Sequence, residues 1–362
     1  MGRFKQWGLA LGALALAGLT GTAAGAESFT VFISGGAYAD AQIEAFVKPF
    51  EAETGIKVNA IKSEVPTAKI ILAVQTGTVD FDLCIRDEGD GIMLDRLGYL
   101  VPIDYSLYDP KELEGLAPGM RPKWGVADTV AAFVLSYNTE SLKGKPQPKS
   151  WADFWDVKNF PGSRTMQGLT NGTQGPLEEA LLADGVEPKD LYPLDVDRAF
   201  RKLDQIKPYV RKWWANGSEV MQLFNANVAD MGMNFDGRVF ALKKAGKPID
   251  LTFNEAKYYA TYWLIPKGAK NATAAQKFVE YATRSRQQGK MAMISGFSPP
   301  NTNAYHFIDP EFAKGLVTSP DNVKSAYAKN AEWYAAIGED GKSNAERLIE
   351  RWNEWIAKRR WG

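Results

Sequence analysis

The sequence contains one cysteine and one histidine in 362 residues. Cys84 therefore has no partner for an intramolecular disulfide, and it lies too far from the N-terminus to carry a lipid after export. Zinc sites draw on Cys and His, and neither H-E-x-x-H nor C-x-x-C occurs, so no metal site is expected. A Ser/His/Asp triad would need His306, and no G-x-S-x-G elbow accompanies it. These absences argue against an enzyme.

The chain also lacks nucleotide-binding loops and an excess of charge of either sign. Neither G-x-x-x-x-G-K-[ST] nor G-x-G-x-x-G is present, so no cofactor is expected, and energy for any transport must come from another protein. Lys and Arg number 43, and Asp and Glu also number 43. Nucleic-acid binding requires a basic patch or stripe, so no nucleic-acid partner is expected.

Long hydrophobic runs are absent beyond the N-terminus. Arg3 and Lys5 precede an apolar run over residues 7–19, and small residues with an A-x-A-like site follow. This run has 13 residues, whereas a membrane-spanning helix needs about 20. The pattern predicts a cleavable signal peptide over residues 1–26 and a mature periplasmic chain that begins near Glu27.

The mature part alternates strand-like and helix-like segments. Helical spacing over residues 39–54 places Phe46, Val47 and Phe50 on one face, and Gly55 stops that helix. Strand, helix, strand order favours an α/β fold with a parallel sheet covered on both sides. The expected strands are 28–33, 56–61, 81–85, 228–235 and 258–265, and the expected helices are 39–54, 68–74, a short one from Ser150, and 345–360.

Aromatic residues make up 12% of the chain, with 11 tryptophans. A surplus of flat side chains suits a cleft that stacks a ligand. The tryptophans at helical spacing within 345–360 are assigned to the core. Trp213 and Trp214 are adjacent on an extended segment and point to opposite faces, so at most one of them should reach a ligand.

Six short motifs appear along the chain in an order typical of one family. With them, the chain resembles the periplasmic solute-binding proteins of ABC importers, in the branch named for spermidine and putrescine binders, over nearly all of its mature length. The motifs are Phe50-x-x-Glu53-Thr54-Gly55-Ile56-x-Val58, Phe81-Asp82-Leu83, Ser150-Trp151-Ala152-Asp153-Phe154-Trp155, Met231-Gly232-Met233-Asn234-Phe235-Asp236-Gly237-Arg238, Tyr262-Trp263-Leu264-Ile265-Pro266-Lys267-Gly268 and Gly296-Phe297-Ser298-Pro299-Pro300-Asn301.

The resemblance implies a two-lobed periplasmic binding protein fold of type II, with two crossing strands that act as a hinge. The crossings should fall near 133–137 and 262–265. Lobe 1 would comprise 27–135 with 266–303, and lobe 2 would comprise 136–265 with 304–362. The implied function is that of a solute receptor, a monomer that hands a small molecule to an ABC transporter permease.

The resemblance also implies where a ligand would bind, at loops beyond the carboxyl ends of the strands. The first loop supplies close backbone approach and an aromatic ring, the second supplies carboxylates, and an aromatic box closes the cleft. Three positions that carry acids in polyamine binders are Asn171, Gly175 and Thr261 here. The expected ligand-binding residues are Ser34, Gly35, Gly36, Tyr38, Asp87, Glu88, Asn171, Phe235, Asp236, Arg238, Tyr259, Thr261 and Phe297.

These departures bear on the charge of the ligand. Each buried ammonium of a polyamine needs a carboxylate, and the sequence has lost three of them. The guanidinium of Arg238 is suited to fork onto a ligand carboxylate, although pairing with Asp236 or Asp230 is an alternative. An ω-amino acid, a betaine or an organic acid is therefore favoured over spermidine. Two alternatives stay open: an ordinary polyamine receptor, and a secreted hydrolase or lyase that uses His306 or an acid pair.

Overall fold

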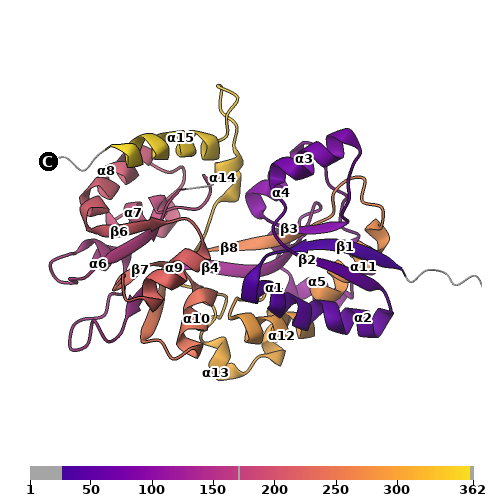
Figure 1. The fold of residues 1–362 in the computed structure, drawn as a ribbon, viewed down its shortest axis with the longest axis horizontal. Helices are drawn as coiled ribbons and strands as arrows, with labels where there is room; N and C mark the ends of the chain where they lie inside the picture. Colours follow the sequence, from indigo (N-terminus) through magenta and orange to yellow (C-terminus); the bar gives the residue numbers. More distant parts are fainter. Residues whose placement is uncertain (1–26, 170–171, 359–362) are drawn as a thin grey trace, which may run out of the picture.

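The structure is a computed structural model that describes residues 27–169 and 172–358. Within them, the chain forms two α/β lobes joined by two long strands (Figure 1). The predicted signal peptide and Asn171 lie outside the described residues. No helix in the described ranges combines the length and apolar character needed to cross a membrane.

One sheet runs through both lobes in the strand order β2-β1-β3-β8-β4-β7-β5-β6, and β9 pairs with β8. Lobe 1 is the part built on β1, β2 and β3, and lobe 2 is the part built on β5, β6 and β7. Within each lobe these strands pair in parallel. The strands are β1 (Ser28–Ile33), β2 (Lys57–Lys62), β3 (Leu83–Asp87), β4 (Val126–Asn138), β5 (Arg164–Gln167), β6 (Val210–Trp214), β7 (Met231–Phe235), β8 (Ile249–Leu264) and β9 (Tyr327–Ala328).

The strands β4 and β8 cross between the lobes as an antiparallel pair. In lobe 2, β4 pairs with β7 from Phe133 to Tyr137. In lobe 1, β8 pairs with β3 from Thr261 to Leu264. The two-lobed fold with two crossing strands is thus confirmed, and the exact lobe boundaries stay a prediction.

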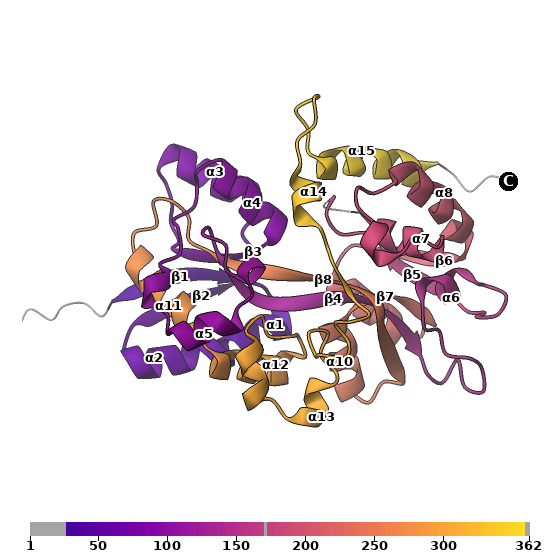
Figure 2. The same cartoon turned by 180° about the vertical axis from the view of Figure 1, so that it is seen from behind.

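Helices flank the sheet on both sides in each lobe. Figures 1 and 2 show α3 and α4 on one side of the lobe 1 strands and α1 and α2 on the other, while α8 and α15 lie opposite α10 in lobe 2. The α-helices are α1 (Gly36–Gln42), α2 (Lys48–Thr54), α3 (Thr67–Thr76), α4 (Glu88–Arg96), α5 (Pro110–Gly115), α6 (Trp151–Trp155), α7 (Leu177–Ala183), α8 (Val196–Ile206), α9 (Gly217–Asn225), α10 (Asp236–Lys244), α11 (Ala272–Ala282), α12 (Ser285–Ser295), α13 (Pro310–Ala313), α14 (Ala331–Ala335) and α15 (Asn344–Ala357). A π-helical turn, η1 (Ile43–Val47), joins α1 to α2, and 3₁₀ turns are η2 (Tyr105–Leu107), η3 (Pro118–Met120), η4 (Pro188–Asp190), η5 (Lys207–Tyr209) and η6 (Thr302–Phe307).

The expected elements form, with shifted ends. The helix predicted over 39–54 begins three residues earlier, at Gly36, and ends before Gly55, whose φ of +74° suits glycine. The side chain of Ser150 accepts from the Asp153 N–H and starts α6 as predicted. The strand predicted over 258–265 is much longer, because its first half pairs with β4 in lobe 2.

The tryptophan stripe of α15 belongs to the core of lobe 2, as expected. Trp352 and Trp355 are buried, and their rings pack 5.3 and 5.4 Å from that of Trp213. Trp214 is fully buried on the opposite face of β6. Neither Trp213 nor Trp214 lines the cavity described below, which agrees with the expectation that at most one of them reaches a ligand.

A buried ionic cluster ties β8 to lobe 2. The ammonium of Lys257 lies 2.9 Å from the Glu178 carboxylate and 3.1 Å from that of Glu179, and all three side chains are fully buried. The same ammonium donates to the Gly175 carbonyl at 2.8 Å. Lys257 thus holds the crossing strand against α7 and against the segment that carries Gln174.

Replacing Lys257 by Met should strongly destabilise the fold, because two buried carboxylates would lose their cation. We expect the free energy of unfolding in urea to fall by about 3–5 kcal/mol. The matched control is Lys243→Met, which removes an exposed ion pair with Asp250 and should cost less than about 1 kcal/mol. Equal losses in the two variants would contradict this assignment.

Candidate ligand-binding site between the lobes

A cavity of about 620 Å³ lies between the lobes, in front of the crossing strands. This volume is within the usual range for small-molecule sites. Most of the predicted site residues meet there. Those that line it are Ser34, Gly35, Gly36, Tyr38, Asp87, Phe235, Arg238, Tyr259, Thr261 and Phe297.

The loop after β1 forms one wall from lobe 1. Gly36 begins α1 with a φ of +67°, a conformation that favours glycine. The turn brings Tyr38 to the wall, and its hydroxyl donates to the Asp128 carboxylate at 2.6 Å. Tyr38 therefore offers the cavity its ring, while its hydroxyl faces the interior of lobe 1.

The end of β3 adds charged groups to the lobe 1 wall. Arg86 points to the cavity, but its guanidinium binds Asp90, with Nε 2.8 Å from Oδ2, and it lies 4.0 Å from Glu64. Asp87 caps α4 by accepting from the Asp90 N–H at 3.1 Å. Among the described residues, no cation lies within 4 Å of Asp87. Three carboxylates, those of Glu64, Asp87 and Asp90, thus surround one guanidinium and leave this wall negative.

Lobe 2 contributes Arg238 from the first turn of α10. Among the described residues, its guanidinium makes one weak hydrogen bond to another side chain, from Nη1 to the Met221 sulfur at 3.9 Å. Asp236 and Asp230 do not pair with it: Asp236 accepts from the Ala132 and Gly237 backbone N–H groups, and Asp230 accepts from Ser163. Burial lowers the pKa of Arg238, and no carboxylate within the described residues opposes that effect.

The N-terminus of α9 lies beside this guanidinium. Asn216 caps the helix by accepting from the Glu219 N–H at 3.0 Å. Gly217 and Ser218 follow at the first two helical positions, whose N–H groups have no partner within a helix. A Cβ added at Gly217 would lie 2.9 Å from Arg238 Nε, so glycine allows the close approach. The result is a cluster of donors on one wall.

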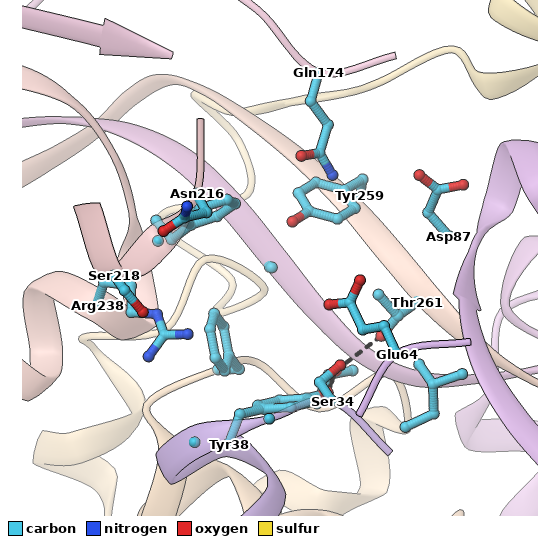
Figure 3. A pocket seen from close by; sticks show the side chains of 18 of the residues that line it. Ser34, Tyr38, Glu64, Asp87, Gln174, Asn216, Ser218, Arg238, Tyr259 and Thr261 are labelled. Carbon is cyan, nitrogen blue, oxygen red and sulfur yellow. Dashed lines mark hydrogen bonds between the residues drawn. The ribbon is translucent and has the colours of Figure 1, made fainter. Parts of the chain in front are cut away.

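Aromatic rings form the walls between these charged ends. Tyr38 meets Phe297 edge-on with ring centroids 5.4 Å apart. Tyr259 stacks on the buried Phe133 ring at 5.5 Å, and Phe235 lies 4.7 Å from that same ring. Figure 3 shows Arg238 and Ser218 at one end of the cavity, Asp87 and Glu64 toward the other, and Tyr259 between them.

Several expected positions do not reach the cavity. Asp236 is 2% exposed and lies behind the wall, because its carboxylate serves two backbone N–H groups. Glu88 is the first residue of α4 and does not line the cavity either; burial raises its pKa, and Lys329 opposes that effect. Gly175 is buried with its carbonyl on Lys257. Asn171 lies outside the described residues.

Sequence reasoning missed several polar lining residues. The additional residues are Glu64, Arg86, Thr129, Gln167, Gln174, Asn216 and Ser218. Asn216 was detectable, since Asn with Glu three residues later is a helix-start signature directly after a strand. Gln167 and Gln174 carry no such local signal, and only the packing of lobe 2 brings them to the site.

A two-lobed α/β fold around a cavity with separated charges and aromatic walls defines a solute-binding protein. The family described as bacterial extracellular solute-binding protein matches residues 45–318, and the chain belongs to that family. It is the solute-binding component of an ABC transporter. Proteins of this kind bind small solutes outside the cytoplasm and work with membrane permeases.

The chain is similar over nearly its whole length to a relative of known name and to solved structures. The gamma-aminobutyric acid-binding protein of Pseudomonas aeruginosa is 33% identical over 362 residues, covering 98% of this chain and 96% of that one. The structure of an ABC transporter from Rhodopseudomonas palustris is 33% identical with a TM-score of 0.80, over 91% of this chain and 99% of that chain. A GABA receptor structure is 32% identical with a TM-score of 0.81, over 93% and 99%.

The buried carboxyl of Asp236 should make stability depend on pH. Burial raises its pKa to about 7, whereas an unfolded aspartate titrates near 3.9. Between these values the folded state binds the extra proton, so the free energy of unfolding falls as pH rises, by at most about 1.4 kcal/mol per pH unit. The fall should level off above the folded pKa.

Asp236→Asn tests this assignment, because the amide keeps the oxygen that accepts from Ala132 and Gly237 but cannot ionise. Urea unfolding at pH 5 and pH 8 should show a smaller loss of stability with rising pH in the variant than in the wild type. A surface control, Asp321→Asn, should leave the wild-type slope intact. Identical slopes in all three proteins would rule out a protonated Asp236.

Proposed function

We propose that this protein captures a small zwitterion of the ω-amino acid type, with its carboxylate on lobe 2 and its ammonium on lobe 1, and delivers it to a membrane permease. Export through a cleavable signal peptide and action as a monomer without enzymatic turnover are part of the proposal. The relative named for gamma-aminobutyric acid supports the ligand class.

The observation that carries the proposal is the state of Arg238. This half-buried guanidinium lines the cavity, and no carboxylate within the described residues lies within 4 Å of it. A partly buried charge without a partner is costly. A ligand carboxylate would provide that partner through two parallel hydrogen bonds, which the planar fork of arginine suits.

The surroundings of Arg238 favour an anionic group further. Gly217 and Ser218 are the first two residues of α9, and Figure 3 shows the Ser218 side chain at the same end of the cavity as Arg238. A helix N-terminus carries partial positive charge and stabilises anions. The guanidinium, the helix end and the hydroxyl thus form a seat for one carboxylate.

The opposite end favours an ammonium. Asp87 and Glu64 line the cavity there, and Asp87 has no cation within 4 Å among the described residues. The ring of Tyr259 lies between the two ends, and that of Phe297 also lines the cavity, so that both would cover a short methylene chain. A molecule with a carboxylate and an ammonium at opposite ends of such a chain satisfies both walls.

This charge arrangement disfavours the polyamine alternative. Both ends of putrescine are cationic, and the lobe 2 wall offers the second ammonium a guanidinium and no carboxylate among its described lining residues. The hydrolase or lyase alternative that uses His306 has no support from the site either. His306 lies exposed on η6, and the described cavity lining contains neither His nor Cys.

Titration calorimetry of Arg238→Ala tests the carboxylate seat. We expect γ-aminobutyrate to bind the wild type and to lose about 2–5 kcal/mol of binding free energy in the variant, because a buried charge pair loses one member. Putrescine and spermidine should bind the wild type poorly. Arg211→Ala, at an exposed position on β6 outside the cavity, is the control and should bind normally.

Tight binding of polyamines that survives Arg238→Ala would refute the proposal and support an ordinary polyamine receptor. Mass spectrometry can detect chemical conversion of a bound solute. Conversion that is abolished by His306→Ala would instead support an enzymatic function. Unchanged γ-aminobutyrate recovered from the complex in one copy per chain agrees with a receptor.

Ligand binding should also close the two lobes about β4 and β8. A ligand that contacts both walls binds the closed state more tightly, so it should reduce the radius of gyration in small-angle scattering and raise the melting temperature with concentration. Butyrate, which lacks the ammonium that lobe 1 would hold, is the matched comparison and should close the protein less. A saturating ligand that changes neither quantity would exclude hinge closure.

A further inference from the structure

A buried carboxylate without a cation lies directly behind the lobe 1 wall. Asp128 on β4 is 0% exposed. Its Oδ2 accepts from the Tyr38 hydroxyl at 2.6 Å and from the Gln42 amide at 3.0 Å, and its Oδ1 has no partner among the described residues. The groups that lower its pKa are neutral donors, led by Tyr38, while burial raises that pKa to about 6. At pH 8 the side chain is an anion.

A β-bulge places this carboxylate. The register of β4 against β8 shifts between Ala127 and Thr129, so Asp128 is the extra residue. Bulges redirect side chains and often occur beside functional sites. Here two consecutive residues come together, with Thr129 Oγ1 3.3 Å from Asp128 Oδ2, although neighbours on a regular strand would point to opposite faces.

A chain of hydroxyls connects Asp128 to the cavity. Tyr38 and Thr129 contact each other through their hydroxyl oxygens. Thr129 and Thr261 are directly opposite on β4 and β8, and their hydroxyl oxygens are 3.1 Å apart. All three residues, Tyr38, Thr129 and Thr261, line the cavity. Hydrogen bonds therefore link the buried Asp128 carboxylate to the cavity wall.

Counting protons fixes the direction of these hydrogen bonds. Each hydroxyl has one proton to donate. The short, charge-assisted bond assigns the Tyr38 proton to Asp128. Thr129 must then donate to Asp128 or to the Tyr38 oxygen, and Thr261 donates to Thr129. The Thr261 oxygen is left with only lone pairs for the cavity, and this wall accepts hydrogen bonds rather than donating them.

We propose that Asp128 determines the specificity of the site for a primary ammonium by orienting, through the Tyr38 hydroxyl, the hydroxyls of Thr129 and Thr261 as acceptors. Asp128 is a positioning residue that does not touch the ligand. The inference rests on the proposed zwitterion receptor and narrows its ligand. A primary ammonium has N–H donors for these acceptors, whereas the quaternary ammonium of a betaine has none.

Calorimetry at pH 8 with three probes separates the contribution of the ammonium N–H groups to binding from those of the positive charge and the carboxylate. The probes are γ-aminobutyrate, its quaternary analogue γ-trimethylammoniobutyrate, and butyrate, which has the carboxylate alone. In the wild type, γ-aminobutyrate should bind at least about tenfold more tightly than either of the other two, the usual effect of hydrogen bonds to a charged group.

Asp128→Asn removes the charge and adds an amide donor that can reverse the chain. The ratio of the butyrate dissociation constant to that of γ-aminobutyrate should fall by about tenfold, while butyrate affinity stays unchanged. A merely structural role would weaken both ligands together and preserve the ratio. Thr261→Val, which removes only the terminal hydroxyl, should lower the same ratio and provides the test should the Asn variant not fold.

Ser136→Ala is the matched control, since Ser136 is buried on the same strand and donates to the Gly232 carbonyl, away from the site. It should leave the ratio at the wild-type value. The inference would be overturned if the ratio of the butyrate to the γ-aminobutyrate dissociation constant stayed unchanged in both Asp128→Asn and Thr261→Val. It would also be overturned if the quaternary analogue bound as tightly as γ-aminobutyrate. Either result would leave the proposed function intact. If the wild type did not bind γ-aminobutyrate at all, the proposed function would be overturned as well.

Discussion

The antiparallel pairing of β4 with β8 constrains every other part of this structure. The two strands pair from Val126 to Asn138 of β4, and each runs from the parallel strands of one lobe to those of the other lobe. Because the two strands stay paired over most of this length, apart from register shifts between Ala127 and Thr129 and between Phe133 and Leu135, a change in the relative orientation of the lobes must bend or twist them. The cavity lies against the part of the pair where Thr129 and Thr261 face each other. The residues of β4 and β8 that line the cavity therefore also belong to the strands that must deform when the lobes move.

The protein treats its buried charges in two different ways. Lys257 is fully compensated by Glu178 and Glu179 and strengthens the contact of β8 with lobe 2. Arg238 and Asp128 have no opposite charge within 4 Å among the described residues, and both lie at or directly behind the cavity wall. Other buried charges in the described ranges also lack an opposite charge: Arg164 donates to three backbone carbonyls, and Asp236 accepts from two backbone N–H groups. Arg238 differs from them because it lines the cavity, where the carboxylate of the proposed ligand would provide its partner.

Much of the fold could be predicted from the sequence, because the signals are local. Apolar periodicity in 39–54 and 345–360 gave the helices, and β-rich runs bounded by glycine gave the strands. The ends were less accurate, since pairing sets them: β8 begins at Ile249 because β4 continues beside it in lobe 2. Most of the cavity lining was located by the resemblance to periplasmic solute-binding proteins, which places the ligand at loops beyond the carboxyl ends of parallel strands.

The patterns in the sequence by themselves determined the order of strands and helices, and its motifs, through the resemblance to periplasmic solute-binding proteins, implied the two-lobed architecture and the loops that meet at the cavity. Only the tertiary structure decided which charged groups face it. Asp236, two residues before Arg238, turns inward to backbone N–H groups, while Asp128, with no motif to mark it, reaches Tyr38 ninety positions away in sequence. Periodicity and spacing act over a few residues, whereas the environment of a carboxylate depends on partners that packing brings from distant segments.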